Sequence, residues 1–115
     1  MYPDDLIRIQ HMLDYAERAM RYAEGRQRPD LDDNDILALA LTRCVEIIGE
    51  AASQVTHNFR EGHPDVPWTE LVGMRNRLIH AYVDVNLNIL WATVTEDLPQ
   101  LVPVLRSIAQ SSGVG

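Results

Sequence analysis

Apolar residues recur every three or four positions through four long stretches of the chain, and this spacing is the period of an amphipathic α-helix. In the first stretch they are Leu6, Ile9, Leu13, Ala16, Met20 and Ala23. Charged residues fill the positions between them, and Gly25 marks the predicted end of this helix. No segment of more than a few residues alternates between apolar and polar side chains as a strand would. The pattern therefore predicts an all-α protein.

The same period predicts two further helices in the middle of the chain. One begins within residues 32–35, where short acidic and amide side chains can cap it, and ends near His57 or Asn58. Residues 59–67, which contain glycine and proline, are predicted to form a connection. The next helix starts at Pro67, because proline is favoured in the first turn of a helix.

A fourth helix is predicted from about Asn86, and its prolines indicate that it is not straight. Pro99 and Pro103 each remove a backbone donor, so we expect a kink near residues 95–99. Gly49, inside the second helix, costs about 1 kcal/mol relative to alanine and indicates close packing against another helix. Four helices with short connections favour an up-down-up-down bundle.

Length and composition place the bundle in a single domain. The chain has 115 residues, 46% of them hydrophobic, which is enough for one core and too few for two. We expect one domain over residues 1–110 and a disordered tail over 111–115, where serine and glycine dominate.

Charge and cysteine content narrow the class of protein. The formal net charge of −7 disfavours a protein that coats nucleic acid with a broad basic surface, so any such contact must be local. The single cysteine, Cys44, cannot form an internal disulfide. The acidic N-terminus lacks the pattern of an export signal, and no apolar run approaches the ~20 residues of a membrane span. We therefore expect a soluble, cytoplasmic protein.

Residues 71–83 differ from the rest of the chain because they contain two arginines, a histidine and a tyrosine but no acid. On a straight helix Arg75 and His80 would lie about 140° apart, whereas Tyr82 would lie about 20° from Arg75. Arg75 and His80 can converge if the helix ends near Ile79, or if a second copy of the chain completes the site. The alternative is that these cations simply stabilise the last turn of the helix.

Other candidate residues carry a weaker signal. Glu46 and Glu50 lie one turn apart and suit a metal or a carboxylate pair, although Arg43 nearby favours an exposed charged face. His57 and His63 flank a predicted turn without a third ligand at metal-binding spacing. We therefore predict no metal site, and we assign His11 to the surface.

The run Arg75-Asn76-Arg77-Leu78-Ile79-His80-Ala81-Tyr82 resembles the Arg-x4-His-x-Tyr signature of the HEPN superfamily, in its HepT-like branch of toxin ribonucleases. Further segments resemble that branch in order and spacing across essentially the whole chain. They are Ile48-Gly49-Glu50-Ala51, Pro67-Trp68, Gly73-Met74-Arg75-Asn76, Trp91 and Leu98-Pro99.

The resemblance implies an all-α homodimer that brings two copies of the motif together in a cleft. It implies a toxin-type endoribonuclease that needs no metal or other cofactor and cleaves RNA, with tRNA as one candidate. Arg75, His80 and Asn76 would be catalytic, and Arg77 would bind substrate. The implied partner is a small nucleotidyltransferase antitoxin that uses ATP to attach AMP to Tyr82.

The residue types suit this chemistry, because RNA carries its own nucleophile in the 2′-hydroxyl. His80 can exchange a proton near neutral pH, and Arg75 can stabilise charge on the phosphate. RNA must approach two acidic chains, so a cleft rimmed by Arg75 and Arg77 would have to focus a local positive field.

Two alternatives stay open. In the first, the chain is a non-catalytic subunit that binds nucleotide or substrate for a nucleotidyltransferase. In the second, it is a helical bundle that only dimerises. Growth arrest on expressing this chain alone would favour the ribonuclease over both.

Overall fold

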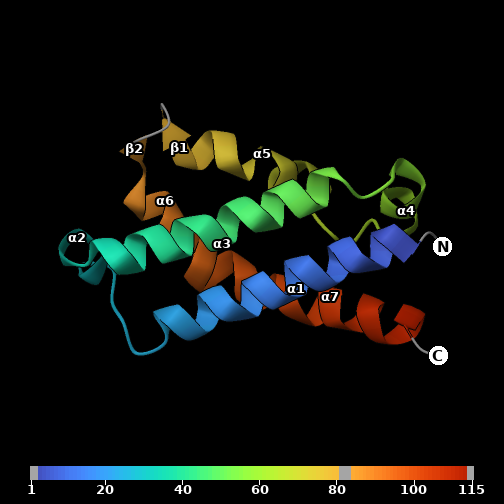
Figure 1. The fold of residues 1–115 in the computed structure, drawn as a ribbon, viewed down its shortest axis with the longest axis horizontal. Coiled ribbons are helices and arrows are strands. Elements are labelled where there is room, and N and C mark those ends of the chain that lie inside the picture. The colour runs from blue at the N-terminus through green and yellow to red at the C-terminus, as the bar shows by residue number, and fades with distance from the viewer. Residues whose placement is uncertain (1–2, 81–83, 114–115) are drawn as a thin grey trace.

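A computed structural model describes residues 3–80 and 84–113, without the side chains of Pro3, His80 and Ser112. Four helical segments, which alternate in direction, make up most of it (Figure 1). They are α1 (Pro3–Ala23), α3 (Asp35–Ser53), α5 (Trp68–Leu78) and a last segment composed of α6 (Leu87–Ala92), the π-helical turn η1 (Thr93–Asp97) and α7 (Leu98–Gly113). The prediction of an all-α helical bundle is confirmed.

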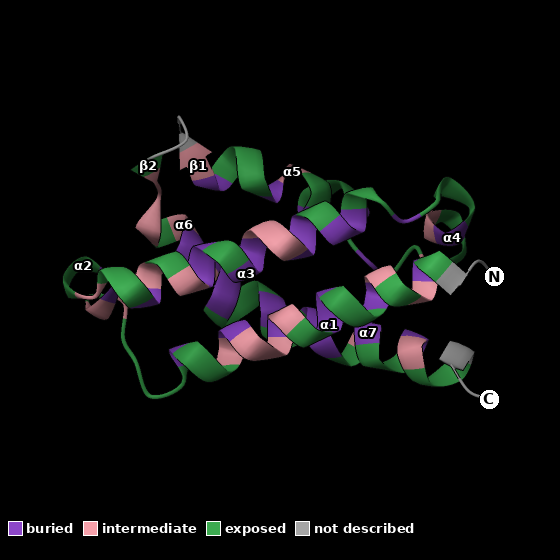
Figure 2. Cartoon of the chain, viewed as in Figure 1, coloured by how far each residue is buried: buried purple, intermediate pink, exposed green. Residues whose placement is uncertain are grey.

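The core lies between these segments, with α3 packed between α1 and α5 and with α7 against α1 (Figure 2). Each long helix turns its apolar stripe inward. Fully buried members of the core include Ile9, Met12, Leu41, Val45, Ile48, Leu78, Leu90, Val94, Leu98 and Leu105. None of the described helices combines the length and the apolar composition that would let it cross a membrane.

Four short elements join the long segments. They are α2 (Asp30–Asp33), α4 (His57–Gly62) and the two-residue strands β1 (Ile79–His80) and β2 (Asp84–Val85). The strands pair in antiparallel fashion, with Ile79 opposite Val85 and His80 opposite Asp84. The apolar spacing predicted none of these elements, because each is shorter than the window over which a period can be recognised.

Helix starts and stops follow the predicted signals. Gly25 has a φ of 75°, a left-handed conformation that glycine adopts without strain, two residues after the end of α1. The side chain of Asn34 caps α3 by accepting from the amide of Leu37 at 3.0 Å. Asn86 caps α6 in the same way, accepting from the amide of Ile89 at 3.0 Å.

The second predicted helix is shorter than expected. α3 ends at Ser53 instead of near residues 57–58, and α4 takes up the first part of the predicted connection. The cause is a second cap, because the hydroxyl oxygen of Thr56 accepts from the amide of Phe59 at 3.4 Å. The ring of Phe59 is buried, which holds α4 on the bundle.

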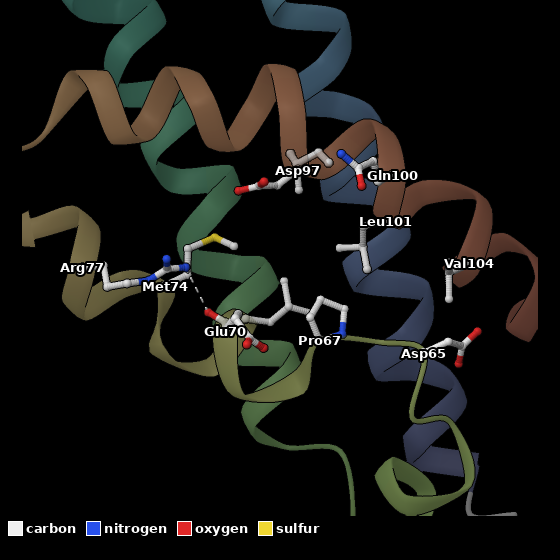
Figure 3. Close-up of a pocket in the computed structure, with 11 residues that line it drawn as sticks. Asp65, Pro67, Glu70, Met74, Arg77, Asp97, Gln100, Leu101 and Val104 are labelled. Carbon is white, nitrogen blue, oxygen red and sulfur yellow. Dashed lines mark hydrogen bonds between the residues drawn. The ribbon is translucent and has the colours of Figure 1, made fainter.

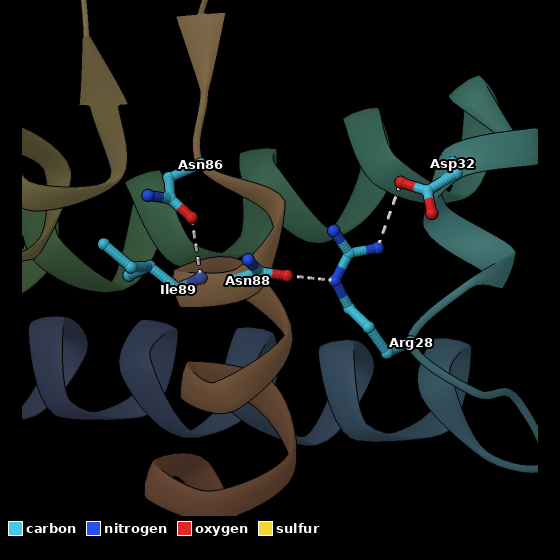
Figure 4. A network of polar contacts seen from close by, with 5 residues as sticks. All are labelled: Arg28, Asp32, Asn86, Asn88 and Ile89. Atoms are coloured by element: carbon cyan, nitrogen blue, oxygen red, sulfur yellow. Dashed lines mark hydrogen bonds and ion pairs between the residues drawn. The ribbon is translucent and has the colours of Figure 1, made fainter.

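A polar network joins α2 to the start of the last segment (Figure 4). The Nε atom of Arg28 donates to Oδ1 of Asn88 at 2.7 Å, and its Nη1 atom donates to Asp32 at 3.1 Å. Because β2 directly precedes α6, this network also helps to fix the strand pair that follows α5.

The irregularity predicted near residues 95–99 is present as η1. Here the amide of Leu98 donates to the carbonyl of Thr93, five residues earlier, which is the bonding pattern of a π-helix. Pro99 has no amide hydrogen to donate to the preceding turn, which gives a physical reason for this wider turn.

The C-terminal end of the chain differs from the prediction. Residues 111–113, expected in a disordered tail, belong to α7, and residues 114–115 lie outside the described part. Ile108 is buried, and its carbonyl accepts from the hydroxyl of Ser111 at 3.3 Å, so the last turns remain attached to the bundle.

Candidate functional site

The candidate site lies where α5 ends. Arg75, Asn76 and Arg77 occupy its last turn, and the amide of Ile79 donates to the carbonyl of Arg75 as the helix stops. Beyond Leu78 the chain is extended, so the 140° offset expected between Arg75 and His80 on a straight helix does not apply. An early end of the helix is one of the two routes by which these residues can converge.

The strand pair holds the backbone of His80 next to this helix end. His80 is opposite Asp84, and the amide of Asn86 donates to the carbonyl of Leu78 at 2.8 Å. Tyr82 lies outside the described residues. Because α5 stops at Leu78, the expected 20° relation between Tyr82 and Arg75 loses its premise of a continued helix.

Arg75 contacts the neighbouring helix α3 through an ion pair. Its Nε atom lies 3.5 Å from Oε2 of Glu46, whose side chain is 25% exposed. The other carboxylate oxygen of Glu46 lies 4.0 Å from Nη1 of Arg43. The Arg75 side chain is itself 55% exposed, so it can bind an anion from solvent while its ion pair with Glu46 is kept.

Close packing of α3 and α5 makes this ion pair possible. A Cβ atom added at Gly49 would lie 3.0 Å from the carbonyl oxygen of Leu71, so the absence of a side chain lets the two backbones approach. Glu46 precedes Gly49 by almost one turn, and Arg75 follows Leu71 by about one turn. The close approach predicted at Gly49 is confirmed, and it sets the register of the site.

Arg75 and Arg77 point away from each other. Arg77 faces a hollow of about 510 Å³ between α5 and α7, where its Nη2 atom donates to the carbonyl of Glu70 at 3.4 Å (Figure 3). The hollow has an apolar floor that includes Met74 and Leu101, and its rim is mostly acidic. Within one chain, Arg77 therefore does not share a surface with Arg75, and Asn76 is exposed on the same turn.

The two glutamates of α3 do not act as a pair. Glu46 faces Arg75, whereas Glu50 accepts from the side-chain amide of Gln54 at 3.1 Å. Among the residues that the structure describes, no three histidine, cysteine, aspartate or glutamate side chains gather at a distance that would hold a metal ion.

The other histidines considered as candidates either contact neighbouring side chains or lie on the surface. His57 pairs with Glu61 at 2.6 Å, and His63 stacks on Phe59 while its carbonyl accepts from the Trp68 indole. His11 is exposed on α1, as predicted.

Cys44 is buried within α3. Burial raises the pKa of its thiol, and Arg18 and Arg21 only partly oppose this effect. The protonated thiol is a poor nucleophile, so Cys44 is no catalytic candidate.

Sequence reasoning missed the role of Glu46 as the partner of Arg75. The two residues lie on different helices, and apolar periodicity does not fix the register between helices. Gly49 was the one usable signal, because a glycine inside a helix marks where a neighbouring backbone comes close.

Comparison with known proteins places this chain in a family. Residues 12–108 match the sequence model of the family described as "Ribonuclease HepT-like". The chain is 37% identical over 102 residues to a "Putative RNase" of Caldanaerobacter subterraneus subsp. tengcongensis, covering 89% of this chain and 91% of that protein.

Two further relatives carry similar names. A "Putative RNase" of Methanocaldococcus jannaschii is 37% identical over 78% of this chain and 83% of its own length. A "Probable ribonuclease HepT" of Thermococcus cleftensis is 48% identical over 54% of this chain and 56% of its own length. No solved structure gave a significant match.

Proposed function

This chain belongs to the HepT-like ribonuclease family and is an endoribonuclease, and we propose that Arg75, Asn76 and His80 form its active site. The observation that carries this assignment is the end of α5. There the exposed side chain of Arg75 is oriented by Glu46, and the strand that contains His80 begins four residues after Arg75.

The proposed reaction uses the 2′-hydroxyl of the RNA as nucleophile. His80 accepts the proton of this hydroxyl as the oxygen attacks phosphorus, and a second His80, from another copy, donates a proton to the departing 5′-oxygen. Arg75 stabilises the added negative charge on the phosphate, and Asn76 orients the phosphate or the histidine. The nucleophile belongs to the substrate, so this scheme needs no metal to generate one.

A homodimer would supply the second histidine. Apolar side chains beside the candidate site support a protein contact there, because Leu39 on α3 is 67% exposed and Val72 on α5 is 37% exposed. Leu39 precedes Glu46 by two turns and lies on the same side of α3. We propose that α5, through Val72, and the last helical segment form the interface, with Leu39 of α3 at its edge. Two copies of the motif would then share one cleft, where Arg77 contributes to RNA binding.

We further propose that the chain is the toxin of a toxin–antitoxin pair in the cytoplasm. Its partner is a small nucleotidyltransferase that transfers AMP from ATP to the hydroxyl of Tyr82 and releases pyrophosphate. Tyr82 lies two residues beyond His80, so an attached AMP would place bulk and a negative charge close to the site. The modification would inhibit by occupying the position of the RNA phosphate.

Expression of the chain without its neighbour tests the toxin activity. Wild type should arrest growth, and His80→Ala should not. A wild type that leaves growth unaffected would favour the non-catalytic binding subunit.

Incubation with the neighbouring nucleotidyltransferase and ATP tests the control. Wild type should gain the mass of AMP and lose RNase activity, and Tyr82→Phe should do neither. Equal modification and silencing of the phenylalanine variant would exclude Tyr82 as the switch.

A further inference from the structure

A second group of basic side chains lies on the side of α3 that faces α1. Arg8 and His11 of α1 and Arg43 of α3 line a groove of about 250 Å³ between these helices. Glu50 also lines the groove, with its carboxylate accepting from the Gln54 amide. A gathering of basic side chains is unexpected in a chain with a formal net charge of −7.

The two arginines are weakly paired within the protein. Among the described residues no carboxylate lies within 4.0 Å of Arg8, and its buried Nε atom has no hydrogen-bond partner. Arg43 reaches Glu46 only at 4.0 Å and stays mostly exposed. A buried donor left without an acceptor destabilises the protein, so binding of an anion that accepts a hydrogen bond from Arg8 would be favoured.

Glu46, which does not itself line the groove, links it to the candidate active site. Glu46 contacts Arg43 with one carboxylate oxygen and Arg75 with the other, so the three side chains form one line across α3. Packed helices lie about 8–10 Å apart, so α1 lies at most about 16–20 Å from α5 across α3. A strand of several nucleotides spans that distance.

We propose that this groove binds phosphates of the RNA strand whose cleaved linkage lies at Arg75, a proposal that rests on the ribonuclease function above. Arg8 and Arg43 donate to phosphodiester oxygens, for which the arginine fork is well suited. His11 adds a third donor at the α1 side. The groove then holds one flank of the substrate while Arg75 and His80 act on the linkage itself.

The test is RNA binding by the full chain carrying His80→Ala, which prevents cleavage. A labelled single-stranded RNA of about 12 nucleotides, within the usual site sizes for single strands, is titrated by fluorescence anisotropy at several salt concentrations. Adding Arg8→Gln and Arg43→Gln should raise Kd at least about tenfold. The slope of log affinity against log salt should shrink by about 0.7 for each lost phosphate contact.

Arg21→Gln is the matched control, because Arg21 lies on α1 but lines the groove toward α7. It should change neither Kd nor the slope beyond a small general effect of charge. If the double variant fails to fold, Arg43→Gln alone, at a mostly exposed position, should still lower the slope by about 0.7.

The outcomes separate this proposal from the ribonuclease function. RNA binding with the same Kd and slope for the double variant and the control would overturn the groove alone. Absence of any RNA binding would overturn both. Binding of free AMP or inorganic phosphate that depends on Arg8 and Arg43, with RNA binding that does not, would make the groove a small-anion site and overturn its role in holding the strand.

Discussion

Glu46 and Arg75 join two helices at the candidate site, with Oε2 of the carboxylate 3.5 Å from Nε of the guanidinium. Contact at Nε leaves the two terminal nitrogen atoms of Arg75 without a partner among the described residues, so they can turn toward a phosphate. Glu46 therefore orients the Arg75 side chain, and removing its charge should lower the rate of RNA cleavage.

Glu46→Gln keeps the side-chain length and removes the charge. We expect kcat on labelled RNA to fall by up to about fivefold, since an exposed ion pair is worth about 0.2–1 kcal/mol. The melting temperature should fall by less than about 8 °C. Glu24→Gln, at the exposed residue directly after α1, is the control. A wild-type kcat in Glu46→Gln would show that this acid does not position Arg75.

Gly49→Ala should destabilise the protein although alanine is the better helix former. The new Cβ would lie 3.0 Å from the backbone oxygen of Leu71, and a helix backbone can yield only if α5 moves. We expect a loss of about 1–3 kcal/mol in thermal unfolding and lower RNase activity, because α5 carries Arg75.

Gly73→Ala on α5 is the matched control for that substitution. Apart from the adjacent residues and the nearby backbone of α5 itself, the described part of the chain has no atom within 4 Å of a Cβ added there. The change should therefore stabilise the protein by up to about 1 kcal/mol. Equal melting temperatures for the two variants would mean that the contact between α3 and α5 is not tight at Gly49.

Light scattering at micromolar concentration should give about twice the 13.1 kDa mass of one chain. Val72→Asp should shift the protein toward monomer, because it places a charge beside the proposed interface. Ile7→Asp, at an apolar position of α1 that is 46% exposed, should not. A monomeric wild type would remove the shared cleft.

Cys44 should resist alkylation in the folded protein. Burial raises the pKa of its thiol, so at neutral pH the reactive thiolate is rarer than in an exposed cysteine. Mass spectrometry after iodoacetamide treatment should show little modification until denaturant is added. Rapid labelling of the native chain would contradict the burial of Cys44.

The long helices could be predicted because the sequence marks them locally. Their apolar spacing gives the buried face, and Asn34, Asn86 and Gly25 mark where backbone groups need a cap or a left-handed residue. The motif on α5 could be found for a similar reason, because its composition differs from that of the rest of the chain.

Features that depend on distant residues could not be predicted. α4 forms where Thr56 donates both its amide and its hydroxyl to Asp5, which is 51 residues earlier in the chain. The pairing of Glu46 with Arg75 depends on the axial register between α3 and α5. The apolar spacing within each helix does not determine that register.

The most direct measurement is cleavage of labelled RNA by the purified chain in the presence of EDTA. Wild type should cleave, and Arg75→Ala and His80→Ala should each lose at least about a hundredfold in rate, the usual share of one catalytic group. Both variants should keep the helical spectrum and melting temperature of wild type, because neither residue belongs to the apolar stripe. Cleavage by His80→Ala at the wild-type rate, or wild-type activity that disappears on chelation and returns with a divalent ion, would contradict the proposed site.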